Sequence, residues 1–204
     1  MHIPNGTTDA LSLVTFQQAL EAADKPCEAY DVTKWIYAPN FYSEYRYILG
    51  TRGKNPLICI GINPSTAKPD DLDNTLKSVE RIALGNGFDS FIMFNVYAQR
   101  ATNPDDMEKC CNIKLHKENM EAFRYVLSVS EKPMVWAAWG TIIEKRDYLP
   151  QCVRDMVEIS QAYNAGWCCA GKVSKKGHPH HPLYLRKDEK IKPFDICTYL
   201  EGLE

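Results

Sequence analysis

Residues 57–75 read LICIGINPSTAKPDDLDNT, and this stretch decides how the rest of the chain is interpreted. It begins with an apolar run, continues through Gly61, Asn63 and Pro64 into two small hydroxyl residues, and then reaches three aspartates. A continuous apolar run is typical of a strand buried on both faces of a parallel sheet. Ligands of such folds bind where the strands end. We therefore predict that residues 61–66 form the floor of a ligand pocket.

Strand-like and helical patterns alternate along the rest of the chain. The segment at residues 42–65 first alternates aromatic and polar residues, then turns, and then becomes continuously apolar. This pattern predicts a hairpin leading into the buried strand. Further apolar strands are predicted at residues 88–98, 133–139 and 166–173. Helical spacing of apolar residues predicts helices at residues 15–24, 72–86, 105–128, 142–162 with a break at Pro150, and 194–203.

This alternation predicts an α/β fold, a three-layer α/β/α sandwich around a mainly parallel four-stranded central sheet. A chain of 204 residues is long enough for one sizeable core. We expect an N-terminal extension with a short helix at residues 1–40, followed by a single domain at residues 41–204.

Composition limits the classes of function. Hydrophobic residues make up 45% of the chain and charged residues 25%, as in ordinary folded domains. A net charge of −2 gives no general attraction to nucleic acid. No apolar run approaches the roughly 18 residues that cross a bilayer, and the first residues do not resemble a signal peptide. We expect a cytoplasmic protein without a membrane partner.

The eight cysteines form no Cys-x-x-Cys motif. A cytoplasmic chain keeps such residues reduced. We favour free core cysteines over a metal site, with an iron–sulfur cluster as the remaining alternative, and expect neither a metal ion nor another cofactor.

Polar or aromatic residues follow each predicted strand. Since the carboxyl ends of parallel strands share one edge, we expect these residues to meet in a pocket. They are Gly61, Ile62, Asn63, Pro64, Ser65 and Thr66 after the first strand, Asn95 and Tyr97 after the second, Trp139 and Gly140 after the third, and His178, His180 and His181 after the fourth.

Each of these residues also has a purely structural explanation. Asn63 can cap a helix, Asn95 can bridge loops, and Trp139 can belong to the core. The histidines can bind a metal, although neighbours in an extended loop point in different directions. The aspartates Asp70, Asp71 and Asp73 can hold magnesium, or can complement the dipole at a helix N-terminus, which we favour.

Taken together, the segments resemble the motifs of the uracil-DNA glycosylase superfamily. GINPS (61–65) is similar to its first motif, and FIMFNVYA (91–98) to the strand that ends in the base-reading asparagine. VWAAWGTIIEK (135–145) is similar to a further strand and helix start, and GHPHHPL (177–183) to the terminal His-Pro-Ser-Pro loop. Most of the chain from Tyr45 onward also resembles an uncharacterised bacterial and phage family, domain of unknown function 1643.

The glycosylase resemblance implies a division of roles. Asn63 would orient water beneath the sugar, His178 would donate to the base carbonyl, and Asn95 would read the edge of the base. Asn63 replaces the aspartate of the most active branch and cannot act as a base, so any hydrolysis should be slower. The other residues at the strand ends would bind the base or ligand.

Three functions follow as hypotheses. The first is cleavage of the N-glycosidic bond of a modified or mispaired base, and the second is binding of a nucleotide or nucleic acid without cleavage. The third is magnesium-dependent nucleotide hydrolysis at the aspartates. We expect a monomer whose partner is DNA or a nucleotide. Phosphates would contact the basic cluster Lys172, Lys175, Lys176 and Arg186, which can equally be a solvated loop.

Overall fold

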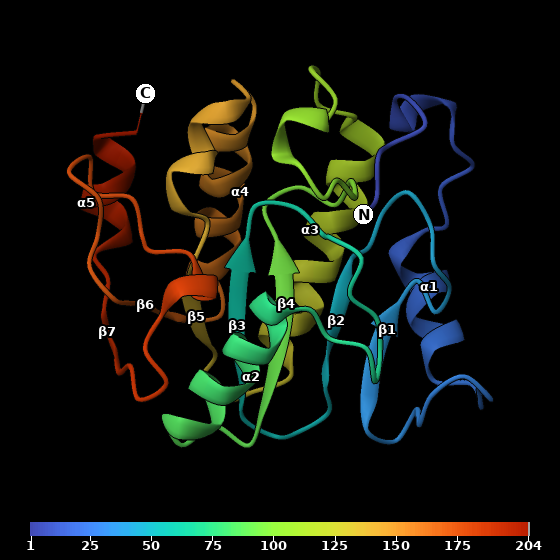
Figure 1. The fold of residues 1–204 in the computed structure, drawn as a ribbon, viewed down its shortest axis with the longest axis horizontal. Helices are drawn as coiled ribbons and strands as arrows, with labels where there is room; N and C mark the ends of the chain where they lie inside the picture. Colours follow the sequence, from blue (N-terminus) through green and yellow to red (C-terminus); the bar gives the residue numbers. More distant parts are fainter. Residues whose placement is uncertain (204) are drawn as a thin grey trace.

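The protein is an α/β fold built on one seven-stranded mixed sheet (Figure 1), and the computed structural model describes residues 1–203. The strands lie in the order β1-β2-β4-β3-β5-β6-β7. Their bounds are Trp35–Ala38 (β1), Ile48–Thr51 (β2), Pro56–Gly61 (β3), Ser90–Asn95 (β4), Met134–Ala137 (β5), Gly166–Ala170 (β6) and Ile191–Pro193 (β7). Strands β4, β3, β5 and β6 are parallel, whereas β1, β2 and β7 are antiparallel to their neighbours.

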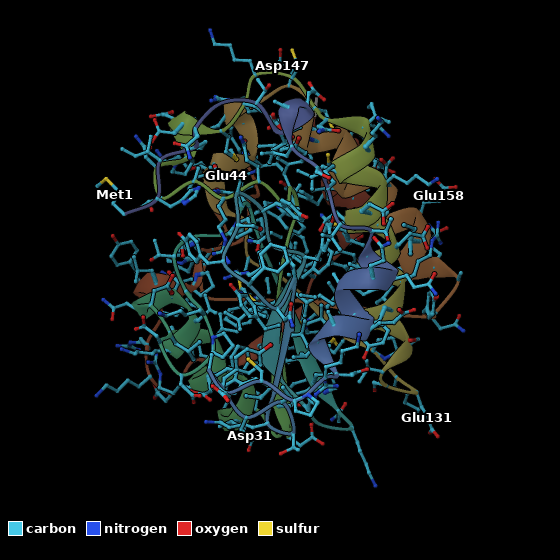
Figure 2. The ribbon with its side chains drawn as sticks, turned by 90° about the vertical axis from the view of Figure 1, so that its right-hand side faces the viewer. Met1, Asp31, Glu44, Glu131, Asp147 and Glu158 are labelled. Atoms are coloured by element: carbon cyan, nitrogen blue, oxygen red, sulfur yellow. The ribbon has the colours of Figure 1, made fainter. Side chains whose placement is uncertain are left out.

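Helices cover both faces of the sheet, which gives three layers (Figure 2). Helix α2 packs on one face, and α1, α3, α4 and α5 pack on the other. The helices are Phe16–Ala23 (α1), Asn74–Gly85 (α2), Ile113–Ser128 (α3), Leu149–Gln161 (α4) and Ile196–Glu201 (α5), with short 3-10 turns at Thr8–Ala10, Pro104–Asp106, Gly140–Lys145 and Pro182–Tyr184. Every residue of β3 and β4 is buried, because both faces of these strands are covered.

The predicted number of four strands is wrong, because three antiparallel strands extend the parallel group. Strand β1 is fully buried but has only four residues, and β7 has three and exposes Lys192 and Pro193, so both are too short for a periodic pattern to stand out. The predicted hairpin is also wrong. Strand β2 pairs with β1 and β4, so β4 lies between β2 and β3. The fully apolar β3 belongs at the centre, where it has a partner on each side.

Side-chain caps fix where the helices begin. Asp73 accepts a hydrogen bond from the Leu76 amide and starts α2, while Asn112 caps α3. The helix expected from residue 105 therefore starts at Ile113, after a separate 3-10 turn. The stretch expected to be helical at residues 142–162 is indeed interrupted close to Pro150: the 3-10 turn Gly140–Lys145 ends, and α4 begins at Leu149 with Pro150 in its first turn, where the missing N–H has no cost.

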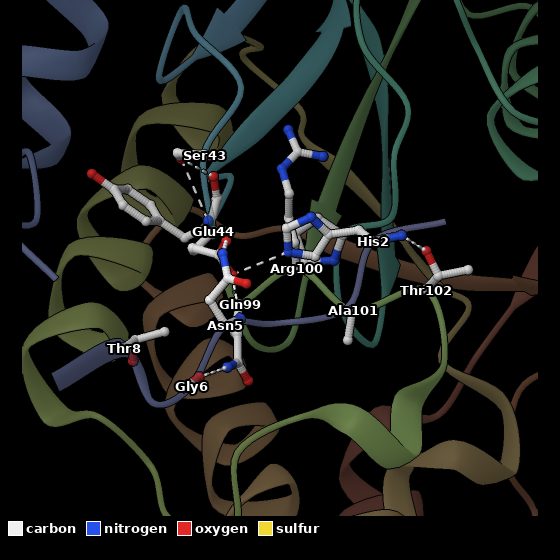
Figure 3. A network of polar contacts seen from close by, with 12 residues as sticks. His2, Asn5, Gly6, Thr8, Ser43, Glu44, Gln99, Arg100, Ala101 and Thr102 are labelled. Carbon is white, nitrogen blue, oxygen red and sulfur yellow. Dashed lines mark hydrogen bonds and ion pairs between the residues drawn. The ribbon is translucent and has the colours of Figure 1, made fainter. Parts of the chain in front are cut away.

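Residues 1–40, which we assigned to an extension, add β1 and α1 to the same sheet and core. Figure 3 shows how the first residues meet the loop after β4. The His2 amide donates to Thr102 Oγ1 at 2.6 Å, and the Thr102 amide donates to the His2 carbonyl at 2.9 Å. Glu44 accepts from the Asn5 side chain and lies 3.2 Å from the His2 ring. The N-terminal segment therefore holds the loop around Thr102.

Candidate functional site

A cavity of about 400 Å³ opens at the edge where the parallel strands end. Its floor includes Gly61, Ile62 and Met93 of the β3 and β4 region, and its walls come from the residues that follow Ile62 and from five further segments. Cavities of this size are typical of small-molecule sites. The wall residues include Asn63 and Ser65, the start of α2 at residues 73–76, the loop residues Ala101, Thr102 and Pro104, and finally Arg46, Ile142, His181 and Leu183.

The orientation of the Asn63 carboxamide is fixed by its neighbours. Its Nδ2 donates to the Ala101 carbonyl at 2.7 Å and to the Pro64 carbonyl at 3.3 Å. Both donors of the amide group are thus used by the protein, which leaves Oδ1 as an acceptor for a ligand or a water molecule. Asn63 is half-buried in the cavity wall.

Ser65 and Asp73 form a second polar pair in the wall. The Ser65 hydroxyl donates to Asp73 Oδ2, while Asp73 Oδ1 accepts from the Leu76 amide at 2.9 Å. The cavity therefore faces the N-terminus of α2, which carries the positive end of the helix dipole. Among the lining residues of the described chain, Asp73 is the one carboxylate.

Two buried guanidinium groups lie at this wall: Arg46 lines the cavity, and Arg100 lies outside its lining. Arg46 is 1% exposed and Arg100 is 0% exposed. Arg46 donates to the Ala67 carbonyl at 3.0 Å, and Arg100 donates to the Ser65 carbonyl and to the Tyr37 hydroxyl at 3.0 Å. In the part of the chain that is described, both Nε atoms are buried without a hydrogen-bond partner.

The charge of Arg46 is costly in this position. Burial, and next the positive charge of Arg100, lower the pKa of Arg46 to about 9, and the Asp73 carboxylate opposes this shift. Buried charges are normally paired, and within residues 1–203 Arg46 forms no ion pair at salt-bridge distance, so its guanidinium in the cavity wall favours an anionic ligand.

Asn95 lies beneath the floor of the cavity. It is 1% exposed, and its Oδ1 lies 3.5 Å from Arg46 Nη2. Its Nδ2 has no hydrogen-bond partner within residues 1–203. A Cβ atom at Gly61 would lie 3.2 Å from this Nδ2 and 2.6 Å from Met93 Cε, so glycine keeps the floor open above the amide.

His181 is the histidine that lines the cavity. The Leu183 amide donates to its Nδ1 at 3.3 Å, which places the proton of the neutral ring on Nε2. Burial, followed by the positive charge of His180, lowers the pKa of His181 below its usual value of 6.5. His181 is therefore a neutral donor at pH 7.

His178 lies elsewhere, in the packing beneath α5. Its Nδ1 is 2.9 Å from the Tyr199 hydroxyl and its Nε2 is 3.2 Å from Glu144, and the residue is 3% exposed. Asn63 and His178 do not face each other across the cavity.

Several other predicted site residues also lie outside the cavity lining. The buried Trp139 donates to Tyr199, and the buried Tyr97 donates to Glu108. Pro64 is buried, Thr66 and Gly140 are half-buried, and the His180 ring contacts its own loop at the His181 carbonyl. The basic residues are exposed and lie on the loops after β6 and after residue 184; they are Lys172, Lys175, Lys176, which pairs with Glu144, and Arg186.

The aspartates do not converge on one point. Asp70 accepts from the Trp35 indole and pairs with Lys34, and Asp71 pairs with Lys68 on the surface. Asp73 alone of the three reaches the cavity.

Sequence reasoning missed Arg46 and the loop residues Ala101 and Thr102. Arg46 lies in a stretch that alternates aromatic and polar residues, and there a strand with one solvated face is the ordinary interpretation. The signal for the loop was the polar segment directly after Tyr97, which follows a strand end in the same way as residues 61–66.

Comparison with known proteins adds a family to this geometry. A family model described as "Protein of unknown function (DUF1643)" matches residues 46–183, about two thirds of the chain. The chain belongs to this family. The matched range of this DUF1643 protein contains the cavity residues named above, from Arg46 to Leu183. No curated protein and no solved structure matches the chain.

No helix of residues 1–203 is both long enough and apolar enough to cross a membrane.

Proposed function

We propose that the cavity binds one nucleotide unit of DNA or a free nucleotide, and that the protein hydrolyses the N-glycosidic bond of a modified or mispaired base. The observation that carries this proposal is the meeting of three groups around one cavity of about 400 Å³. They are the Asn63 carboxamide oxygen, the neutral His181 ring and the buried Arg46 guanidinium. The base, the sugar and the phosphate of a nucleotide offer partners for these three groups.

In the proposed reaction, the oxygen of a water molecule attacks the anomeric carbon of the sugar. The bond between this carbon and the base nitrogen breaks, and its electron pair leaves with the base. Asn63 Oδ1 holds the attacking water, and His181 Nε2–H donates to the base carbonyl where negative charge develops. The water proton passes to solvent or to the Asp73 carboxylate, and solvent protonates the released base.

The glycosylase resemblance of the sequence supports this assignment, with one change of residue. His181 takes the donor role that the resemblance gave to His178, because both nitrogens of His178 contact other side chains. The unpaired amide of Asn95 fits its role of reading the base through the open floor at Gly61.

A second function, binding without cleavage, is favoured by a different observation. Asn63 donates both amide hydrogens to backbone carbonyls, and both oxygens of Asp73 accept hydrogen bonds from the protein. Such hydrogen bonds hold both side chains in fixed positions, as a rigid recognition surface requires. They also make the Asp73 carboxylate a weaker base, because both of its oxygens are already occupied.

The test is a strand-nicking assay. Oligonucleotides carrying uracil, hypoxanthine, hydroxymethyluracil or a mismatch are incubated with the protein and then with alkali. We expect abasic sites with the native protein and about 100-fold fewer with Asn63→Ala, since misplacing the water costs this order of rate. Asn55→Ala is the matched control, because Asn55 is exposed at the opposite end of β3.

The two functions give different results. If native protein yields no abasic sites above the Asn63→Ala background, the hydrolase proposal is rejected. If the same preparation nevertheless binds the oligonucleotides and Arg46→Met abolishes this binding, the binding function replaces it. Affinity measured at two salt concentrations then shows whether phosphates contribute.

A further inference from the structure

A second cluster of reactive side chains lies away from the cavity, between the N-terminal ends of α3 and α4. Cys111 precedes the capping residue of α3, His116 lies in the first turns of that helix, and Cys152 lies in the first turn of α4. One ligand atom from each residue falls within 4.8 Å of the other two. Helices α3 and α4 pack against each other, so the fold fixes this meeting.

The histidine of this cluster is held by a carboxylate. His116 Nε2 lies 2.6 Å from Asp155 Oδ2, one turn beyond Cys152 on α4. Its other ring nitrogen, Nδ1, is buried and has no hydrogen-bond partner in residues 1–203. A carboxylate that fixes one nitrogen of a histidine while the other nitrogen binds metal is the usual arrangement of protein metal sites.

We propose that Cys111, His116 and Cys152 bind a zinc ion. Thiolate and imidazole ligands select zinc among the common divalent ions, and two thiolates neutralise its charge. Cys111 stands just before α3 and Cys152 in the first turn of α4, so helix packing holds both sulfur atoms next to His116. A bound zinc ion would give His116 Nδ1 the partner that it otherwise lacks. Two free thiols beside the ring do not explain why this buried nitrogen has no hydrogen bond.

The geometry needs little adjustment. Tetrahedral zinc holds two sulfur atoms about 3.8 Å apart, so the present atoms would move by no more than about 1 Å. Cys111 lines a surface depression of about 580 Å³, and His116 and Asp155 line another of about 500 Å³. A metal ion can therefore enter from solvent, and a water molecule can occupy the fourth position.

Spacing along the sequence argued against a metal, because the cysteines form no short motif. The ligands come from the start of α3, including the residue before its cap, and from α4, and only packing brings these separate parts of the sequence together. This site is independent of the cavity and of its proposed function.

The experiment measures metal bound to the full, tag-free chain. Reduced protein is loaded with Zn²⁺, dialysed and analysed for metal content, and a second sample is titrated with Co²⁺. We expect one zinc per chain, and with cobalt both the strong visible absorption of a four-coordinate ion and sulfur-to-metal charge-transfer bands. Zinc added to the cobalt form should remove these bands.

Variants assign the ligands. Cys111→Ser and His116→Ala should abolish stoichiometric loading, and Asp155→Asn should weaken metal affinity about 10- to 100-fold. Cys110→Ser is the matched control, because the neighbouring Cys110 is exposed and lies outside the cluster, so it should load one zinc. The thermal unfolding of each variant is measured in the presence of chelator. A cooperative transition like that of the chelator-treated native protein shows that the variant folds.

Three outcomes overturn the proposal. The first is native protein that retains less than one tenth of an equivalent of zinc. The second is equal loading of Cys111→Ser and Cys110→Ser. The third is a Cys111–Cys152 disulfide in protein prepared without reductant, combined with no zinc binding after reduction, which would make the pair a redox couple instead.

Discussion

The Ser65 hydroxyl donates a hydrogen bond to the Asp73 carboxylate, and this contact joins the loop after β3 to the first turn of α2. The same carboxylate caps α2 through the Leu76 amide. One side chain therefore starts a helix and shapes the wall of the cavity. The structural and functional interpretations of Asp73 are compatible, and substitutions can separate them.

Replacing Asp73 by asparagine should preserve the cap, because asparagine is an equally good capping residue, whereas alanine should lower the free energy of unfolding by about 0.5–2 kcal/mol. Ser65→Ala should cost about 1 kcal/mol through loss of one hydrogen bond. Urea unfolding measures these values, with the exposed Ser12→Ala as a control. Equal stability of Asp73→Ala and Asp73→Asn would show that the capping contact contributes nothing.

Arg46 should respond to anionic ligands. At a ligand concentration 100 times its Kd, a nucleoside monophosphate should stabilise the native protein by about 2.7 kcal/mol. Arg46→Met should abolish this ligand-dependent gain, because methionine fills similar space without charge. Arg124→Met, on the exposed face of α3, should retain it. Thermal unfolding with the nucleotide, inorganic phosphate and the uncharged nucleoside separates the contributions of phosphate and base.

The sequence was most informative where one local pattern determines the structure. Continuous apolar runs located β3, β4, β5 and β6, and the edge where they end contains the cavity. It was least informative where packing decides. Strand β2 pairs with β4, which is remote in the sequence, and local residue patterns do not reveal such a pairing. Strand β7 is too short to show an apolar pattern.

The histidines illustrate the same limit within one loop. His178, His180 and His181 are nearly adjacent, and their side chains point in different directions. The motif resemblance favoured His178, but tertiary contacts with Tyr199 and Glu144 hold that residue in the core. Only the path of the loop past Gly140 brings His181 to the cavity, where a Cβ at Gly140 would lie 3.6 Å from the His181 Cβ.

His181 should make stability depend on pH in a defined direction. Its pKa in the folded state is lowered, so the unfolded chain binds its proton more readily. The neutral ring contributes stability that is fully present above pH 6.5, the unfolded value, and is lost as pH falls from 6.5 through the lower folded pKa. His181→Gln should flatten this part of the curve. Unfolding by urea at several pH values measures it, and an unchanged slope in the variant would contradict the assignment.

The N-terminal segment should be required for stability, through the buried carboxylate of Glu108. This group accepts hydrogen bonds from the Thr8 amide at 2.8 Å, from the Thr8 hydroxyl at 2.7 Å and from the Tyr97 hydroxyl. Thr8→Val removes one donor from a charged acceptor that is 7% exposed, so it should lower the free energy of unfolding by about 1.5–3 kcal/mol.

Thr7→Val is the control for this change. Thr7 is the exposed neighbour of Thr8, and its hydroxyl makes no capping hydrogen bond. Both variants are compared with the native protein by urea unfolding at pH 7. If Thr8→Val and Thr7→Val differ by less than about 0.5 kcal/mol, the size of an ordinary surface effect, the contact between Thr8 and Glu108 does not stabilise the folded protein. A larger difference shows that the first ten residues unfold together with the rest of the domain, because a carboxylate between β4 and α3 then depends on a donor from this segment.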